Sequence, residues 1–96
     1  MARYKNISSA TTETLIAKKS AHSGNINKIV ITNHDNTDST RAKLYLYDGT
    51  NTYTLVETTI PAGTSLVLED NLSFNINTYD LKIDSSTTAE ITVIIK

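Results

Sequence analysis

Aliphatic and polar residues alternate along most of this 96-residue chain, and this period of two limits its fold more than any other feature. Successive side chains of a β-strand point to opposite faces, so an alternating segment predicts a strand with one buried face. No segment has both the length and the 3.6-residue period of a helix. The sequence therefore predicts an all-β protein.

Four segments alternate clearly, and their apolar residues are expected on inner faces: Ala42, Leu44 and Leu46; Leu66 and Leu68; Tyr79, Leu81 and Ile83; Ala89, Ile91, Val93 and Ile95. The segment 26–32, INKIVIT, is more continuously apolar and predicts a strand covered on both faces. Residues 12–19 are interpreted as a strand, although a helical turn also fits. Residues 1–10 are expected to form an extended N-terminal arm or an edge strand.

Short turn signals separate these segments: Ser23-Gly24-Asn25, residues 33–40, Asp48-Gly49, Pro61-Ala62-Gly63 and residues 84–88. They leave seven or eight short strands at regular spacing, which is typical of a sandwich or a small barrel. We expect residues 1–96 to form one small antiparallel β-sandwich that is jelly-roll-like, with an immunoglobulin-like sandwich as the alternative.

The composition restricts how such a domain is stabilised and what it binds. A chain of this length has a thin core, and without cysteine it has no disulfides, so association with other subunits is the remaining common source of added stability. The net charge of −1 argues against a nucleic-acid partner. No apolar run reaches the roughly 18 residues that span a bilayer, and the N-terminus lacks the apolar region of a secretory signal. We therefore expect no membrane partner.

The segment 43–57, KLYLYDGTNTYTLVE, predicts a β-hairpin. The preferred register centres the turn on Gly49-Thr50, because a shift of one residue would send the leucines to solvent. In this register Asp48 opposes Asn51, Leu46 opposes Tyr53 and Leu44 opposes Leu55. The two leucine-containing pairs, Leu46 with Tyr53 and Leu44 with Leu55, then lie on the core face.

The outer face of this hairpin then carries Tyr45, Tyr47, Thr52, Thr54 and Val56. Tyrosine is enriched in protein–protein interfaces because its ring is apolar and its tip is polar. Tyr45, Tyr47 and Val56 are therefore the candidate interface residues. Two other interpretations stay open: cross-strand Tyr–Thr pairs on a solvated hairpin, and a sugar-stacking platform, which the absence of tryptophan makes weaker.

No group of residues predicts catalysis, a cofactor or a metal centre. Residues 33–40, NHDNTDST, superficially resemble a calcium loop but lack the glycine and glutamate of an EF-hand, whose positions Thr40 and Leu46 occupy. A weak sandwich-loop calcium site and a polar loop of Asx turns both stay open. His22 and His34 lack a third ligand for zinc, and no nucleophile motif accompanies the serines. We expect no enzymatic activity.

Several segments of the sequence resemble those of a known protein family. INKIVITN (26–33), LYDGTNTY (46–53), IPAGTSLVLED (60–70) and ITVIIK (91–96) are similar to phrases in short Thr/Asn-rich virion structural proteins of tailed bacteriophages, especially those of marine and cyanobacterial hosts. The resemblance implies a β-sandwich that decorates or cements the capsid, or one that sits on the tail. It includes no motif with a chemical role, so no functional residue is carried over.

These observations together predict a non-enzymatic phage virion protein that decorates or cements the capsid through protein–protein contacts. Its expected partners are copies of itself in a homo-oligomer, for example a trimer, and the major capsid protein or other virion proteins. The alternatives are a tail or fibre accessory and a carbohydrate-binding module for host attachment. The expected localisation is the virion, after synthesis in the cytoplasm of a bacterial host.

Overall fold

The strands of this protein pair as one long hairpin folded back on itself. The computed structural model describes residues 3–8, 11–69, 71–86 and 90–96. Its described elements are β1 (Arg3–Ile7), β2 (Thr11–Ile16), β3 (Asn25–Ile26), β4 (Ile29–Asn33), β5 (Thr40–Tyr47), β6 (Thr52–Ile60), β7 (Thr64–Leu68), β8 (Leu72–Ser73), β9 (Asp80–Ser85) and β10 (Ile91–Ile95). Strand β1 pairs with β10, β2 with β9, β3 with β8, β4 with β7 and β5 with β6, always antiparallel.

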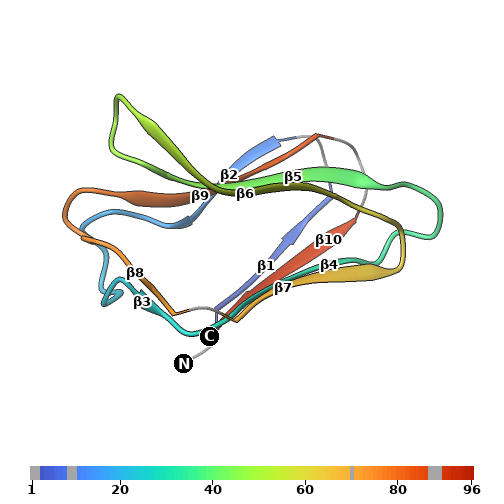
Figure 1. Cartoon of the computed structure of the whole chain (residues 1–96), viewed down its shortest axis with the longest axis horizontal. Helices are drawn as coiled ribbons and strands as arrows, with labels where there is room; N and C mark the ends of the chain where they lie inside the picture. Colours follow the sequence, from blue (N-terminus) through green and yellow to red (C-terminus); the bar gives the residue numbers. More distant parts are fainter. Residues whose placement is uncertain (1–2, 9–10, 70, 87–89) are drawn as a thin grey trace.

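Two further pairings, β10 with β4 and β9 with β5, join these pairs into two four-stranded sheets. Their strand orders are β1-β10-β4-β7 and β2-β9-β5-β6, and the sheets face each other with the short β3-β8 pair at one end (Figure 1). Without β3 and β8, the eight longer strands form the two interlocked layers of a jelly roll. The predicted all-β, jelly-roll-like sandwich is confirmed, and β3 and β8 raise the strand count above the seven or eight expected.

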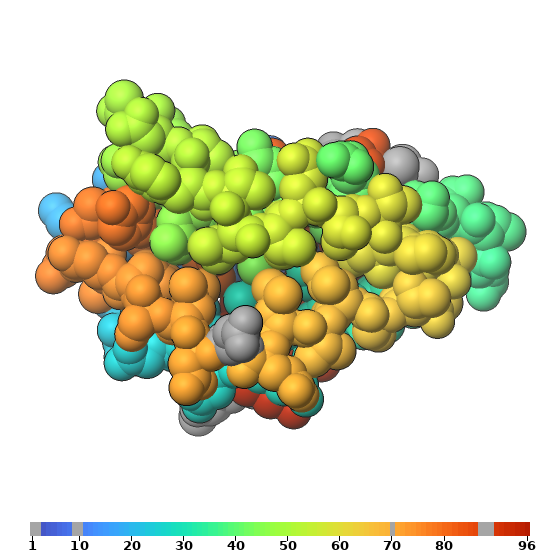
Figure 2. All heavy atoms as spheres, in the orientation of Figure 1, coloured from blue at the N-terminus to red at the C-terminus, as the bar shows by residue number. Residues whose placement is uncertain are grey.

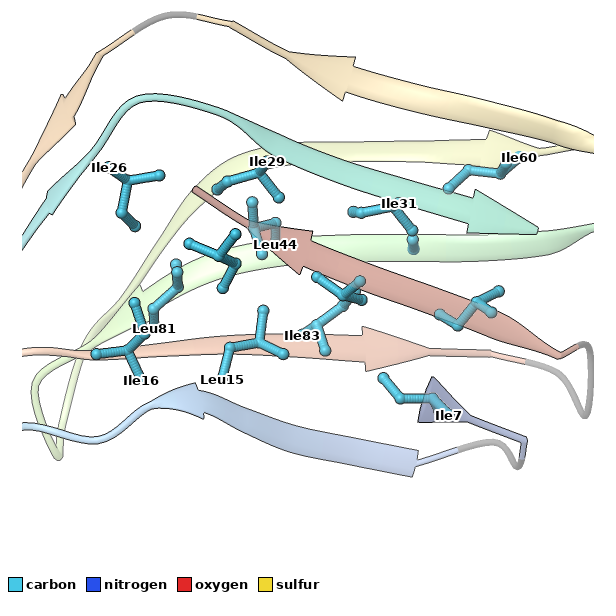
Figure 3. Packing of buried hydrophobic residues seen from close by; sticks show 14 residues of the cluster. Ile7, Leu15, Ile16, Ile26, Ile29, Ile31, Leu44, Ile60, Leu81 and Ile83 are labelled. Atoms are coloured by element: carbon cyan, nitrogen blue, oxygen red, sulfur yellow. The ribbon is translucent and has the colours of Figure 1, made fainter. Parts of the chain in front are cut away.

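One aliphatic layer fills the space between the sheets (Figure 3). Every described strand except β7 and β8 contributes at least one residue to the buried set, which is Ile7, Leu15, Ile16, Ile26, Ile29, Ile31, Ala42, Leu44, Ile60, Leu81, Ile83, Ile91, Val93 and Ile95. The predicted inner-face residues Leu46, Leu66 and Leu68 pack against this layer from its margin. Ala89, also predicted to face inward, lies outside the described residues. Full burial of one Ile, Leu or Val side chain of this layer stabilises the fold by about 1.5–3 kcal/mol.

The outer face of β4 differs from the prediction. Residues 26–32 were expected to form a strand covered on both faces, but Val30 and Thr32 are only half-buried. The second sheet covers the inner face, where Ile29 and Ile31 lie. Nothing in the described chain lies over the outer face, because both four-stranded sheets are single layers. The prediction of two covered faces is therefore wrong for the isolated chain.

The 43–57 hairpin forms with the predicted turn. The N–H of Asp48 donates to the carbonyl oxygen of Asn51 at 3.2 Å, and Gly49 adopts a φ of 102°. Oδ1 of Asp48 accepts the backbone N–H groups of Asn51 and Thr50 at 2.7 and 2.8 Å. These bonds, first Asn51 and then Thr50, hold the pKa of the Asp48 carboxyl below its usual range.

Beyond the turn, a β-bulge corrects the predicted register. Leu46 opposes Tyr53 as expected, but Leu44 opposes Val56 instead of Leu55. Leu55 is thus the extra residue on β6, and an extra residue inverts the inward–outward alternation that follows it. Val56 consequently packs against the core layer, whereas Leu55 is 38% exposed.

The β3-β8 pair requires glycine at position 24. Gly24 has a φ of 83°, and a Cβ atom there would overlap the carbonyl oxygen of Phe74. The two backbones are held close because the N–H of Phe74 donates to the carbonyl oxygen of Gly24 at 2.9 Å. A side chain at this position therefore costs both backbone strain and a steric clash.

We expect Gly24→Ala to lower the free energy of unfolding by about 2–4 kcal/mol, since it combines positive-φ strain with overpacking. Gly63→Ala is the matched control, because Gly63 also has a positive φ, of 76°, but faces open space. The control should lose only the strain contribution, about 1–2 kcal/mol. Urea denaturation of both variants measures the difference, and equal losses would contradict the close backbone approach.

Candidate interaction surfaces

Tyr45 lies on the outer face of the β2-β9-β5-β6 sheet, but its neighbours cover it. The residue is only 7% exposed. Its hydroxyl donates to Oδ1 of Asp84 on β9 at 3.1 Å, and Nζ of Lys43 lies 5.3 Å from the centre of its ring. The polar tip and the ring face are both satisfied within the chain, so little of Tyr45 is left for a partner to contact.

The environment of Tyr45 favours its neutral phenol. Burial raises the pKa of the Tyr45 hydroxyl, and the Asp84 carboxylate that accepts its hydrogen bond raises it further. The same Asp84 oxygen also accepts a hydrogen bond from Oγ1 of Thr12 at 2.6 Å. One carboxylate thus links side chains of β2, β9 and β5 across the outer face.

Tyr47, the second predicted interface residue, is half-buried. Its hydroxyl donates to the carbonyl oxygen of Gly49 at 3.0 Å. Nζ of Lys82 lies 5.1 Å from the centre of the ring, within the range of a cation–π interaction. Tyr47 therefore keeps more accessible surface than Tyr45, although it too has partners in its own chain.

Val56, the third predicted interface residue, does not share the outer face with the tyrosines. The bulge at Leu55 turns Val56 towards the core, where it packs against the aliphatic layer. Its assignment to the outer face is therefore wrong. The role of Tyr45, Tyr47 and Val56 in a protein–protein contact stays a prediction.

The polar loop between β4 and β5 is organised by Asn33, which is fully buried. Nδ2 of Asn33 donates to the carbonyl oxygens of Asp38 and Ile60 at 2.8 and 2.9 Å, and its Oδ1 accepts the N–H of Asp35 at 3.1 Å. Oδ2 of Asp35 in turn accepts the N–H groups of Asp38 and Thr37 at 2.9 and 3.1 Å. These two bonds lower the pKa of Asp35. The loop is thus a series of Asx turns.

The structure brings no metal-ligand set together in the part of the chain that it describes, where no three His, Cys, Asp or Glu residues gather. Nδ1 of His34 lies 3.8 Å from Oε2 of Glu90. Nδ1 of His22 accepts the N–H of Gly24 at 2.9 Å, and burial, followed by the positive charge of Arg3, lowers the pKa of His22. Within the described residues there is likewise no helix able to span a membrane.

The sandwich has two open sides, and they differ in chemistry. On one side, Nζ of Lys5 on β1 lies 3.5 Å from Oε2 of Glu13 on β2, so an ion pair bridges the two sheets. The other side, between β6 and β7, faces the viewer in Figure 2, with β6 above and β7 below. It holds an apolar groove of about 220 Å³, lined by Ile29, Leu55, Leu68, Asn71 and Leu72.

A second apolar surface crosses the outer face of the β1-β10-β4-β7 sheet. Tyr4 pairs with Ile94, Ile94 with Val30, and Val30 with Val67, so one residue from each strand lies in a straight line. Tyr4 is 71% exposed and Val67 45% exposed, while Ile94 and Val30 are half-buried. These four residues are called the apolar row below.

The sequence interpretation missed the apolar row, although a signal for it was present. The segments INKIVIT and ITVIIK carry apolar residues at both odd and even positions. In INKIVIT this pattern was interpreted as a strand covered on both faces, and in ITVIIK only the alternating face of Ile91, Val93 and Ile95 was singled out. The structure places Val30 and Ile94 on an open face instead.

Polar residues flank the apolar row on both sides. The adjacent row towards the β4-β5 loop is Asn6, Thr92, Thr32 and Ser65, which is uncharged. Its members are hydrogen-bonded in pairs, Thr92 Oγ1 to Asn6 Oδ1 at 2.7 Å and Thr32 Oγ1 with Ser65 Oγ at 2.9 Å. On the other side, Nζ of Lys28 lies 3.4 Å from Oε1 of Glu69, and Lys28 pairs through its backbone with Lys96.

Comparisons with known proteins yield similarities in fold. No family model matches the chain, and no curated protein matches its sequence. Two structures of a pentameric capsid protein isolated from metagenomic phage sequences have a TM-score of 0.54 and 16% sequence identity over 99% of this chain. The chain spans 61% and 59% of the length of those two proteins.

A third structure with a similar fold belongs to a bacterial enzyme. The CBM22-1 and GH10 modules of Clostridium thermocellum xylanase 10B, complexed with xylohexaose, have a TM-score of 0.51 and 12% identity over 99% of this chain and 24% of theirs. At these levels of identity, the comparisons establish a shared β-sandwich fold. They agree with the jelly-roll strand order of the two sheets.

We expect the link between Tyr45 and Asp84 to make stability fall at high pH. The folded protein holds the phenol proton more tightly than the unfolded chain, whose tyrosine pKa is about 10. The stabilisation is therefore fully present below about pH 10 and is lost as pH rises through the folded pKa. Thermal melting from pH 8 to 11 should show a steeper loss for the parent than for Tyr45→Phe. Parallel curves would contradict this role of Tyr45.

Proposed function

We propose that the protein is a non-enzymatic structural component of a phage virion that decorates or cements the capsid through protein–protein contacts. The observation that carries this proposal is the jelly roll itself, which matches a phage capsid protein over 99% of this chain. The resemblance of several segments to those of short Thr/Asn-rich virion proteins of tailed phages points to the same class. The expected partners are copies of this chain and the major capsid or other virion proteins.

A capsid-decorating protein acts by contact, so it requires exposed apolar surface and no catalytic group. Apolar area removed from water contributes about 25 cal/mol per Å², so a contact that spans neighbouring capsomers raises the free energy needed to separate or expand them. The apolar row and the groove beside Leu55 and Leu68 supply such surface outside the core. The near-neutral net charge of −1 suits a partner that is recognised by shape rather than by long-range attraction.

We expect the purified protein to co-sediment with purified, undecorated capsids of the phage that encodes it and to raise their melting temperature. Capsids that already carry their complete decoration are the matched control, since their sites are filled and should bind no more protein. The decoration role would be wrong if the protein stayed in the supernatant with undecorated capsids as well. Binding to purified tails alone would support the tail or fibre accessory instead.

A carbohydrate-binding module for host attachment is the second candidate. It is favoured by one observation, the similarity in fold to xylanase modules complexed with xylohexaose. Of Tyr45 and Tyr47, Tyr47 keeps the more accessible surface for a sugar to contact. On a glycan array, the virion role predicts no binding. Binding that disappears in Tyr47→Ala and persists in Tyr45→Phe would favour the carbohydrate module.

A further inference from the structure

We propose that the outer face of the β1-β10-β4-β7 sheet binds a second copy of this chain, in a two-fold contact centred on the apolar row. The inference deepens the proposed function and rests on it in one respect, because it names the surface through which a decoration protein meets its own copies. The predicted contact is distinct from the tyrosines of the hairpin, which lie on the opposite outer face.

The apolar row is surface that the fold leaves without a partner. In β10 and β4, apolar side chains occupy both faces, with Ile95, Val93, Ile31 and Ile29 inward and Ile94 and Val30 outward. Strands of this composition ordinarily lie between two covering layers. The second sheet covers only the inward residues of β10 and β4. A second copy of the chain would cover the outward residues Ile94 and Val30 as well.

Charge favours a neutral partner. The two central rows of the face, the apolar row and the Asn6–Ser65 row, contain no charged side chain. At the margins, Lys28 is paired with Glu69 and His34 lies beside Glu90, and Lys96 adds one further positive charge next to Lys28. A strongly charged partner would gain no attraction from the two central rows and would lose hydration. Another copy of the same neutral face meets no such penalty.

The order of the rows makes the face complementary to itself. A two-fold axis that runs along the apolar row lays each of its residues against the same row of the copy. The same operation sets Lys96 and Lys28 over the hydroxyls of Thr92 and Thr32 of the copy, and Glu69 over that of Ser65. Like charges are therefore not opposed, and each charged group meets a hydrogen-bonding partner. Two-fold contacts between identical patches are the commonest form of self-association.

The size of the face determines how strong the contact can be. Four strands about 4.8 Å apart and five residues of about 3.4 Å each give an outer face of roughly 300 Å². Two such faces bury roughly 600 Å², which is below the 1,200–2,000 Å² of stable complexes, so we expect a weak contact that forms at high protein concentration. On a particle that holds many copies close together, such a weak contact gains strength through high effective concentration.

The test is self-association of the full chain in solution. Sedimentation equilibrium and amide NMR spectra recorded from about 0.05 to 1 mM should show a monomer–dimer equilibrium in this range. Resonances of Tyr4, Val30, Val67 and Ile94 should move with concentration, whereas those of Tyr45 and Tyr47 should not.

Val67→Lys is the diagnostic variant, because an exposed edge-strand lysine is tolerated in the monomer, whereas the two-fold axis along the apolar row sets the two introduced lysines against each other. It should abolish the concentration dependence while leaving the melting temperature of dilute protein unchanged. Leu55→Lys is the matched control, since Leu55 has similar exposure but lies in the groove on β6. It should dimerise like the parent.

A parent that stays monomeric to 1 mM, or one whose self-association survives Val67→Lys, would overturn the inference. Tyr4→Ser gives a second check, because Tyr4 is the most exposed residue of the apolar row and its loss should weaken dimerisation without affecting the core. Capsid co-sedimentation reports separately on the proposed function. A monomeric protein that binds capsids would leave that function standing and remove only this contact.

Discussion

The structure depends on the nested antiparallel pairing that brings the two ends of the chain together. Strand β1 pairs with β10, and β10 also pairs with β4, so the C-terminal strand lies in the middle of a sheet. Among the strand pairings of the described residues, only β5-β6 is local in sequence, and each of the others closes a longer loop. With no cysteine in the chain, this pairing is stabilised by one aliphatic layer between the sheets.

The two outer faces of the sandwich differ in a way that bears on function. On the β2-β9-β5-β6 sheet, the tyrosines and charged groups satisfy one another, as the contacts of Tyr45 with Asp84 and of Tyr47 with Lys82 illustrate. On the β1-β10-β4-β7 sheet, apolar side chains lie in line without a covering layer. The first face is complete within one chain, whereas the second leaves the apolar row open in the described chain. This contrast favours the second face as the assembly surface.

Alternation in the sequence was enough to predict the all-β sandwich, most inner-face residues and the Gly49-Thr50 turn, because each of these depends on neighbours in sequence. The register beyond the turn failed at Leu55, since a bulge is selected by packing on the core rather than by local propensity. The burial of Tyr45 depends on Asp84, which is 39 residues away and reaches it only through the β5-β9 pairing. The apolar row was missed because its members come from four strands that become neighbours only in the folded sheet.

The position of β10 between β1 and β4 is the central claim, because the jelly roll, the core layer and the apolar row all require it. The most direct measurement is a set of backbone NOEs from isotope-labelled protein. The structure predicts cross-strand NOEs from Ile94 to both Tyr4 and Val30. NOEs that instead connect residues 91–95 with residues 80–85, as in a hairpin of consecutive strands, would contradict the fold and remove the surface on which the proposed assembly depends.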